Sequence, residues 1–223
     1  MAAPSRRTLV KEGASAERTV RELRNQILQG RLLPGEQIRQ EEIAEQLRIS
    51  RVPVREALSV LASEGLLTHR PHQGYFVTKR SPEELAQIGL MLALLEEELT
   101  RTIVWPTEEF VAELRSLNAD MERLVDEPEW VDMVAINHQF HLRIFGLSPL
   151  NLVLDEVRRL WMLADAFIAI DYATRERRRQ TVAQHERIIK ALAARSRARL
   201  LKSFRDHRDT TNVGARAGMA HGG

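Results

Sequence analysis

Apolar positions recur at helical spacing along most of the chain. In the first third the pattern predicts three helices, at residues 16–30, 40–47 and 50–65. Two short runs with strand character follow at residues 66–69 and 75–78, on either side of a basic tip that contains Gly74. The first third is therefore predicted to form a three-helix bundle with a two-stranded wing.

From Pro82 onward the strand signals vanish and helical periodicity continues. It predicts six helices, at about residues 82–103, 107–126, 129–145, 149–172, 175–193 and 196–212. Breakers separate several of them, including Pro106, Pro128 and Pro149. The predicted fold is mainly α: an N-terminal winged helix-turn-helix followed by an all-α helical bundle.

The third predicted helix carries two arginines on its polar side. Ser50 stands at its N-cap, and Pro53 lies in the first turn, where a missing N–H costs little. Arg51 and Arg55 lie one turn apart, opposite an apolar side. That apolar side comprises Val54, Ala57, Leu58 and Leu61. The arrangement is typical of a DNA-reading helix, whose arginines pair with guanine or bridge phosphates, and also of a solvated amphipathic helix.

The neighbouring segments favour the DNA-reading interpretation. The helix at 40–47 is followed by only Arg48, Ile49 and Ser50 before the next helix begins, which is helix-turn-helix spacing. With the helix at 16–30 and the wing, the segment has every part of a winged helix.

These pieces resemble the winged helix of GntR-family bacterial transcription regulators over about residues 16–80. The resemblance rests on separated pieces in the right order: Leu33-Pro34-Gly35, Ile43-Ala44, SRVPVREAL at 50–58, Glu64-Gly65-Leu66-Leu67 and Gly74. It implies that Arg51 and Arg55 contact operator DNA, with Ser50 at the DNA backbone and the wing in the minor groove. The implied DNA-binding set is Ser50, Arg51, Pro53, Arg55, Arg48, His72 and Gly74.

Two positions depart from the pattern of that family. Arg48 occupies the turn position where the family usually has glycine, so either the turn is strained or Arg48 reaches a phosphate. Glu41 stands where some members carry another DNA-contacting arginine, which leaves a contact at this position unsupported.

Charge is distributed unevenly between the two parts. Residues 1–80 contain 14 basic and 9 acidic side chains, a net charge of +5, whereas residues 81–223 contain 19 basic and 22 acidic, a net charge of −3. A basic first part suits a DNA-binding domain joined to a domain with another partner. There is no cysteine, which excludes disulfides and thiolate chemistry. With no apolar run of about 18 residues and no signal-peptide segment, we expect a cytoplasmic protein without a membrane partner, nucleoid-associated when bound to DNA.

The change of character near residue 80 predicts two domains between two disordered tails. The expected division is a tail over 1–14, the winged helix-turn-helix over 15–80, an all-helical effector-binding and dimerisation domain over 81–212, and a tail over 213–223.

Histidines give the second part its candidate chemistry. Asn137 and His141 are four residues apart and share a helix face, whereas His138 points about 100° away. His185 and His207 follow apolar core positions on the last two predicted helices. If they converge, three imidazoles and an amide oxygen can hold a divalent metal such as zinc, nickel, manganese or iron. Histidines that only pack in a core, or lie on the surface, give the same spacing.

The second part resembles the FCD domain, the all-helical ligand-binding domain of one GntR subfamily, over about residues 82–212. The resemblance rests on Phe140-His141, on QHERII at 184–189 and on His207. It implies a metal bound by Asn137, His141, His185 and His207, because the subfamily has aspartate or asparagine four residues before the first histidine. It also implies a small carboxylate as effector.

Two residues depart from the pattern of that subfamily, and a third, Asn137, affects the charge of the site. Asn137 is a neutral ligand, so the bound ion keeps more positive charge, which favours an anionic effector. Leu92 stands where the subfamily often has an arginine, and Phe204 replaces a polar residue one turn before His207. The pocket is therefore predicted to be apolar, for an effector with a larger hydrophobic part or around a mainly structural metal.

These features together predict a transcription regulator that binds a symmetric operator as a homodimer, acts as a repressor and responds to a small carboxylate-type metabolite. A constitutive DNA-binding dimer with a structural metal is the alternative. A metal-dependent hydrolase has less support, because the chain lacks HExxH, G-x-S-x-G, G-x-G-x-x-G and P-loop motifs. We therefore expect a regulator and not an enzyme.

Overall fold

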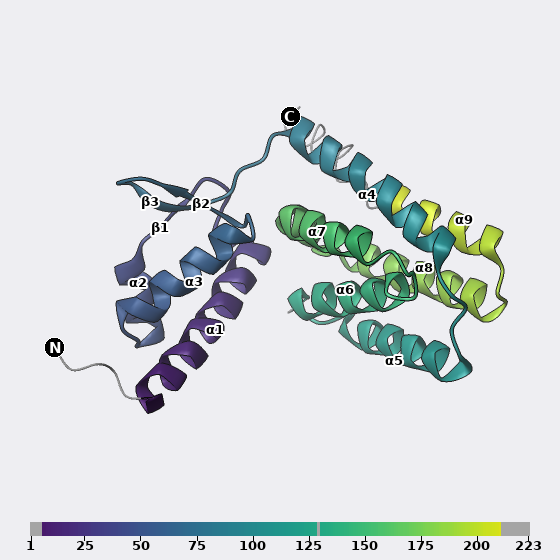
Figure 1. The fold of residues 1–223 in the computed structure, drawn as a ribbon, viewed down its shortest axis with the longest axis horizontal. Helices are drawn as coiled ribbons and strands as arrows, with labels where there is room; N and C mark the ends of the chain where they lie inside the picture. Colours follow the sequence, from purple (N-terminus) through teal and green to yellow (C-terminus); the bar gives the residue numbers. More distant parts are fainter. Residues whose placement is uncertain (1–5, 129, 211–223) are drawn as a thin grey trace. The chain divides into compact units, whose positions relative to one another are not determined.

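The computed structural model describes residues 6–128 and 130–210 (Figure 1). The chain divides into two compact units, with the boundary between Arg80 and Ser81. The tail predicted over 213–223 lies outside the described residues. Each unit is described by itself below.

The N-terminal unit is a winged helix-turn-helix. Its described elements are α1 (Arg6–Leu28), β1 (Gln37–Ile38), α2 (Gln40–Leu47), α3 (Arg51–Ser63), β2 (Leu67–Arg70) and β3 (Gly74–Val77). The strands form an antiparallel sheet in the order β1-β3-β2, with Ile38 opposite Tyr75 and Leu67 opposite Val77. The residues of this unit without solvent exposure include Leu23, Val54, Ala57, Leu58 and Leu61. The apolar side predicted for the third helix is thus its core side.

Two features of this unit differ from the sequence prediction. Helix α1 begins at Arg6, inside the segment expected as a tail. Residues 6–16 contain no proline, and only Gly13 interrupts residues of reasonable helix propensity. The strand β1 was not predicted, because a strand of two residues gives no periodic signal. It forms through pairing with Tyr75 and Phe76, which lie far along the chain.

The C-terminal unit is an all-α bundle, as predicted. Its described helices are α4 (Pro82–Thr102), α5 (Glu108–Leu124), α6 (Val131–Phe145), α7 (Asn151–Asp171), α8 (Arg175–Ala193) and α9 (Arg197–Thr210). The closest neighbours are α8 with α9, α4 with α7 and α5 with α8 (Figure 1). One core joins these helices and includes Leu99, Leu114, Phe140, Phe145, Leu160, Ile188 and Phe204.

Local signals fix where these helices begin. Ser81 and Glu84 form a reciprocal capping box at α4, in which each side chain accepts a hydrogen bond from the other residue's N–H. Pro82 follows at the first helical position. At α5 and α8 the N-cap hydroxyl groups of Thr107 and Thr174 each accept a hydrogen bond from a backbone N–H of the first turn. Within the described residues, every helix is too short or too polar to span a membrane.

Candidate metal centre and DNA-binding face

Helix α3 presents a basic face to solvent. Arg51 and Arg55 are exposed on one side, while the apolar residues of the helix are buried on the other. Ser50 holds the N-cap position in an extended conformation, and its side chain makes no capping hydrogen bond. The predicted orientation of this helix is confirmed. Contact of these residues with DNA stays a prediction.

The wing is attached to α3 through a side-chain contact. The hydroxyl groups of Ser59 and Tyr75 lie 3.0 Å apart, and the His69 ring packs beside Tyr75. At the tip, His72 and Gly74 have φ angles of 63° and 93°, in the left-handed region. The exposed His72 side chain is therefore carried on a tight turn at the end of two paired strands.

Two residues of the predicted DNA-binding set have structural roles of their own. Pro53 is buried in the first turn of α3, where it contributes to packing. Arg48 ends α2 in the left-handed conformation, with φ 53° and ψ 47°, so this arginine adopts a backbone conformation that glycine tolerates best. Arg48 is exposed, and contact of its side chain with a phosphate stays a prediction.

Three histidines from three helices meet inside the C-terminal unit. Nε2 of His141 on α6 lies 3.1 Å from Nε2 of His185 on α8 and 3.1 Å from Nε2 of His207 on α9. All three side chains are buried. Nitrogens bound to one ion at about 2.0–2.1 Å are separated by roughly 2.8–3.4 Å when they are neighbours in octahedral or tetrahedral geometry. Two of the three separations thus match those of ligands bound to a single ion, and the ligand nitrogens of all three rings lie within 4.8 Å of one another.

Burial keeps these imidazoles neutral, which is the form that binds metal. It lowers the pKa of His141 and His185 well below the usual 6.5. Burial, assisted by the positive charge of Arg177, lowers the pKa of His207 to about 3. Nδ1 of His207 donates a hydrogen bond to Oε1 of Gln184 at 2.7 Å, which leaves the Nε2 lone pair of His207 turned toward the other two rings.

Asn137 is the candidate oxygen ligand. It lies one helical turn before His141, and its Oδ1 atom is buried with no hydrogen-bond partner among the described residues. A buried acceptor without a donor is costly, and a cation would satisfy it. Three neutral imidazoles and one amide oxygen suit a divalent transition-metal ion better than calcium or magnesium, which prefer oxygen ligands throughout. The residues present therefore fit the metal that the sequence suggested.

A buried acid–base network lies beside the histidines. The Trp161 ring meets the His141 ring edge-on, with centroids 5.8 Å apart, and its Nε1 donates to Oε1 of Glu96 at 2.9 Å. The other Glu96 oxygen lies 3.6 Å from Nη1 of Arg208. Burial raises the pKa of Glu96, and the charge of Arg208 opposes that rise. Arg208, the residue after the candidate ligand His207, thus connects α9 to α4.

The contacts of Gln184 and Glu96 were not predicted from the sequence. Gln184 is adjacent to His185 in the sequence but forms its hydrogen bond with His207. Helical periodicity does not predict that pairing. For Glu96 a signal existed, because it continues the apolar stripe of α4 between Leu92 and Leu99, both of which are buried. Phe204 is buried beside the histidines, with its ring centroid 5.7 Å from that of His141, and an apolar effector pocket there stays a prediction.

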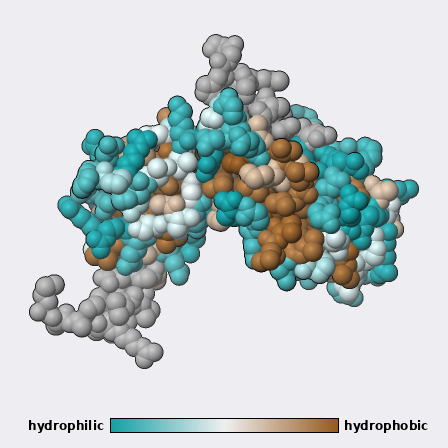
Figure 2. All heavy atoms as spheres, turned by 45° about the horizontal axis from the view of Figure 1, so that its top comes forward, coloured by the Kyte–Doolittle hydropathy of each residue, from teal (hydrophilic) through white to brown (hydrophobic). Residues whose placement is uncertain are grey.

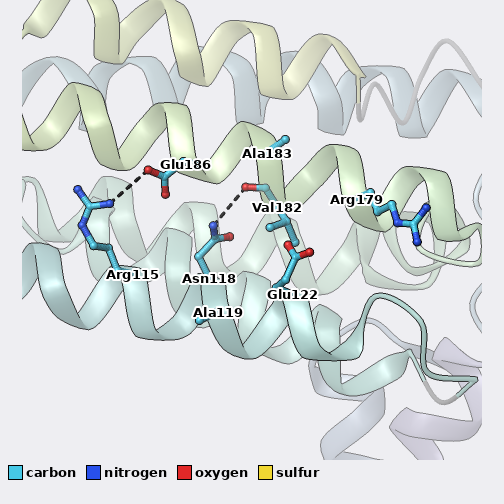
Figure 3. A pocket seen from close by; sticks show the side chains of 8 residues that line it. All are labelled: Arg115, Asn118, Ala119, Glu122, Arg179, Val182, Ala183 and Glu186. Carbon is cyan, nitrogen blue, oxygen red and sulfur yellow. Dashed lines mark hydrogen bonds and ion pairs between the residues drawn. The ribbon is translucent and has the colours of Figure 1, made fainter.

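A groove of about 530 Å³ lies elsewhere on this unit, between α5 and α8 (Figure 3). Arg115 and Glu186 pair at one end of it at 3.2 Å, and Asn118 donates to the backbone oxygen of Val182 in its middle. The groove is not lined by Asn137, His141, His185 or His207. We assign it no part in the metal centre.

Two family models match the chain. Residues 15–77 match the model described as "Bacterial regulatory proteins, gntR family", and residues 80–210 match the model described as "FCD domain". Together the two matches span both units of the structure.

The chain is similar to proteins that are named as transcription regulators. The Nta operon transcriptional regulator of Aminobacter aminovorans is 33% identical over 57% of this chain and 60% of its own length. McbR of Escherichia coli is 29% identical over 63% of this chain and 64% of its own length. Its solved structure covers 93% of this chain with a TM-score of 0.77 at 21% identity, a likeness of fold. The gluconate operon transcriptional repressor of Bacillus subtilis is 23% identical over 89% of this chain and 84% of its own length. The chain thus matches less than two thirds of the length of the first two relatives.

Proposed function

The chain belongs to the gntR family of bacterial regulatory proteins, with an FCD domain after its winged helix, and is a DNA-binding transcription regulator; from this premise we propose that it is a homodimeric repressor whose metal-centred pocket binds a small anionic effector. The observation that carries the DNA half is the exposed pair Arg51 and Arg55 at the start of α3. A repressor of this kind works in the cytoplasm and on the nucleoid. Its relatives are named as regulators, and we place no reaction at the histidines.

Arg55 provides the test of the DNA-binding role. An arginine in the major groove pairs with guanine or phosphate, so Arg55→Ala should weaken operator binding about tenfold or more at physiological salt. Fluorescence anisotropy with an operator selected from random DNA measures this. The control is Arg21→Ala, which removes an exposed arginine from α1. Equal affinity of the Arg55 variant and the wild type would contradict the assignment.

The proposed metal site would bind its ion through His141, His185, His207 and Asn137. A divalent ion bound there supplies a positive centre that can accept an effector carboxylate as a further ligand. The chain contributes no carboxylate to the proposed ligand set, and Arg177 and Arg208 add positive charge near His207. The electrostatic surroundings therefore favour an anion. The ring of Phe204 gives the same pocket an apolar wall.

Elemental analysis with native mass spectrometry tests the metal role, on protein purified without added metal. We expect one divalent ion per chain with a retained small acid, and loss of the ion in the double variant His141→Ala, His185→Ala. The control His72→Ala, a histidine of the wing, should keep it. Full metal content in the double variant would mean that other residues bind the ion. No metal in the wild type, even when offered, would favour a constitutive DNA-binding dimer.

The proposed dimer forms through the exposed face of α4. Leu90, Met91 and Leu94 lie within little more than one turn of this helix and are 62%, 39% and 65% exposed. Figure 2 shows a continuous hydrophobic area on the C-terminal unit. Large apolar residues grouped on a surface commonly mark a protein interface. A second copy is the occupant we propose, because a symmetric operator requires two winged helices, and α4 begins directly after the first of them.

A further inference from the structure

We infer that Glu41 determines operator specificity by holding Arg51 in position to read a base. The inference rests on the proposed role of α3 in operator binding. Oε1 of Glu41 on α2 lies 3.1 Å from Nη1 of Arg51 on α3. The pair therefore joins the two helices of the helix-turn-helix on the side where both residues face solvent. From the sequence alone, no role is assigned to Glu41.

The simplest interpretation of Glu41 is an ordinary surface charge. An acidic residue in the first turn of α2 suits the helix dipole, and an exposed ion pair adds little stability to a fold. The side chains are 63% and 70% exposed, so stability alone does not account for their placement. A carboxylate on a DNA-binding face also repels phosphates. Its presence there requires a benefit other than general affinity for DNA.

That benefit follows from what the pair does to Arg51. Glu41 cancels the charge of Arg51, so the pair gains little from phosphate neutralisation and counterion release. Bidentate pairing with guanine depends on the direction of the donors, which the carboxylate fixes. With Nη1 held by Glu41, the Nε and Nη2 edge of the guanidinium remains available for guanine O6 and N7. Arg51 then acts as a base reader, and Glu41 as its positioning residue.

The next residue provides a matched control. Glu42 carries the same charge in the same helical turn, but its carboxylate pairs with Arg39 at 3.1 Å. Arg39 is the residue before α2, away from the reading helix in sequence. Glu41→Gln and Glu42→Gln therefore remove one negative charge each from α2, and only the first removes a contact with Arg51.

The experiment measures discrimination rather than affinity. An operator is selected from random DNA with the wild-type protein, and the guanine read by Arg51 is located as the base pair at which Arg51→Ala loses discrimination. Dissociation constants for the operator and its substituted form are then measured at several salt concentrations. We expect Glu41→Gln to reduce the discrimination at that base pair about fivefold or more, while random DNA binds more tightly with a salt slope steeper by about one.

The controls separate the possible results. Glu42→Gln should tighten binding to random DNA and keep the wild-type discrimination. Adding Glu41→Gln to Arg51→Ala should cause no further loss of discrimination, because the two residues act together. Wild-type discrimination in Glu41→Gln, or equal losses in the two glutamate variants, would overturn the inference. If the wild type selects no operator, the proposed DNA-binding function itself fails.

Discussion

At the residue scale, Asn137 sets the charge of the proposed metal centre. The three imidazoles are neutral, and the asparagine oxygen adds a dipole but no charge. A carboxylate of the same shape would bring a negative charge to a buried dication in surroundings already made positive by Arg177 and Arg208. In the proposed site, asparagine would therefore bind the ion more weakly than aspartate in the same position.

Asn137→Asp should raise the affinity for a divalent ion by about tenfold or more, a gain of ~1.4 kcal/mol. Competition against a chromophoric chelator measures the change. The opposite change, Asn137→Ala, removes the oxygen and should lower the affinity. An unchanged affinity in both variants would show that Asn137 is not a ligand. Because the aspartate leaves less positive charge for an anion, the same variant should bind a carboxylate effector more weakly.

The histidines predict how stability of the metal-free protein varies with pH. Their pKa values are lowered in the folded state, to about 3 for His207, whereas in the unfolded chain they are near 6.5. Below pH 6.5 the unfolded chain therefore binds protons that the folded chain excludes. The stabilisation is complete above pH 6.5 and is lost as the pH falls, by about 1.4 kcal/mol per pH unit for each imidazole.

Urea unfolding in the presence of a chelator, between pH 7.5 and 5, measures this slope. His207→Asn should make the slope shallower by about one proton, since one buried imidazole is removed. A free energy of unfolding that does not change over this range would mean that the histidines are protonated in the folded protein.

At the element scale, the sequence predicts what local rules determine. The helix at 40–47 has the predicted bounds, and Ser81 and Pro82 mark the start of α4, because capping and periodicity act within one element. The two-residue β1 depends on partners in β3, and no local pattern encodes it. The face shared by Asn137 and His141 follows from their spacing. That His185 and His207 reach the same point depends on how three helices pack, which spacing alone does not give.

In the turn between α2 and α3, Arg48 has a backbone conformation that suits glycine better, which predicts a stabilising substitution. Arg48 is held in the left-handed region, which costs a non-glycine residue about 1–2 kcal/mol. Arg48→Gly relieves this strain and loses some of the gain to the greater freedom of the unfolded chain, so the N-terminal unit should gain about 1 kcal/mol.

Denaturant unfolding followed by a probe in each unit measures the effect of Arg48→Gly. Arg195→Gly is the matched control, because Arg195 has φ 47° in the C-terminal unit and should stabilise that unit instead. A loss of stability in Arg48→Gly would show that the arginine side chain contributes more than its backbone strain costs. If Arg48 reaches a phosphate, the same variant should also bind operator with a shallower salt slope.

At the scale of the whole molecule, one helix links the proposed effector pocket to the rest of the chain. Arg208, next to the candidate ligand His207, lies 3.6 Å from Glu96 and 3.7 Å from Glu97, both on α4. Helix α4 begins two residues after the N-terminal unit ends, and it carries the exposed leucines of the proposed dimer face. An effector that binds two arrangements of α4 with different affinity would thereby alter the spacing of two winged helices.

A substitution in the proposed dimer face tests whether dimerisation and operator binding are linked. Leu94→Glu places a charge in the proposed interface at a residue 65% exposed within the chain, so the C-terminal unit should fold and the dimer should dissociate. Each separated chain then holds one half-site, and operator affinity should fall about 100-fold or more, because the second winged helix no longer binds as part of one molecule. Analytical ultracentrifugation and operator titration measure the two effects together.

The matched control is Leu152→Glu, on a leucine of α7 that is 86% exposed. Its charge should leave both the sedimentation and the operator affinity unchanged, because exposure of a single leucine does not by itself make an interface. A dimeric Leu94→Glu variant would place the two-fold axis on another surface. A monomeric variant with full operator affinity would mean that one winged helix suffices, and the coupling through α4 would then lose its route to the DNA.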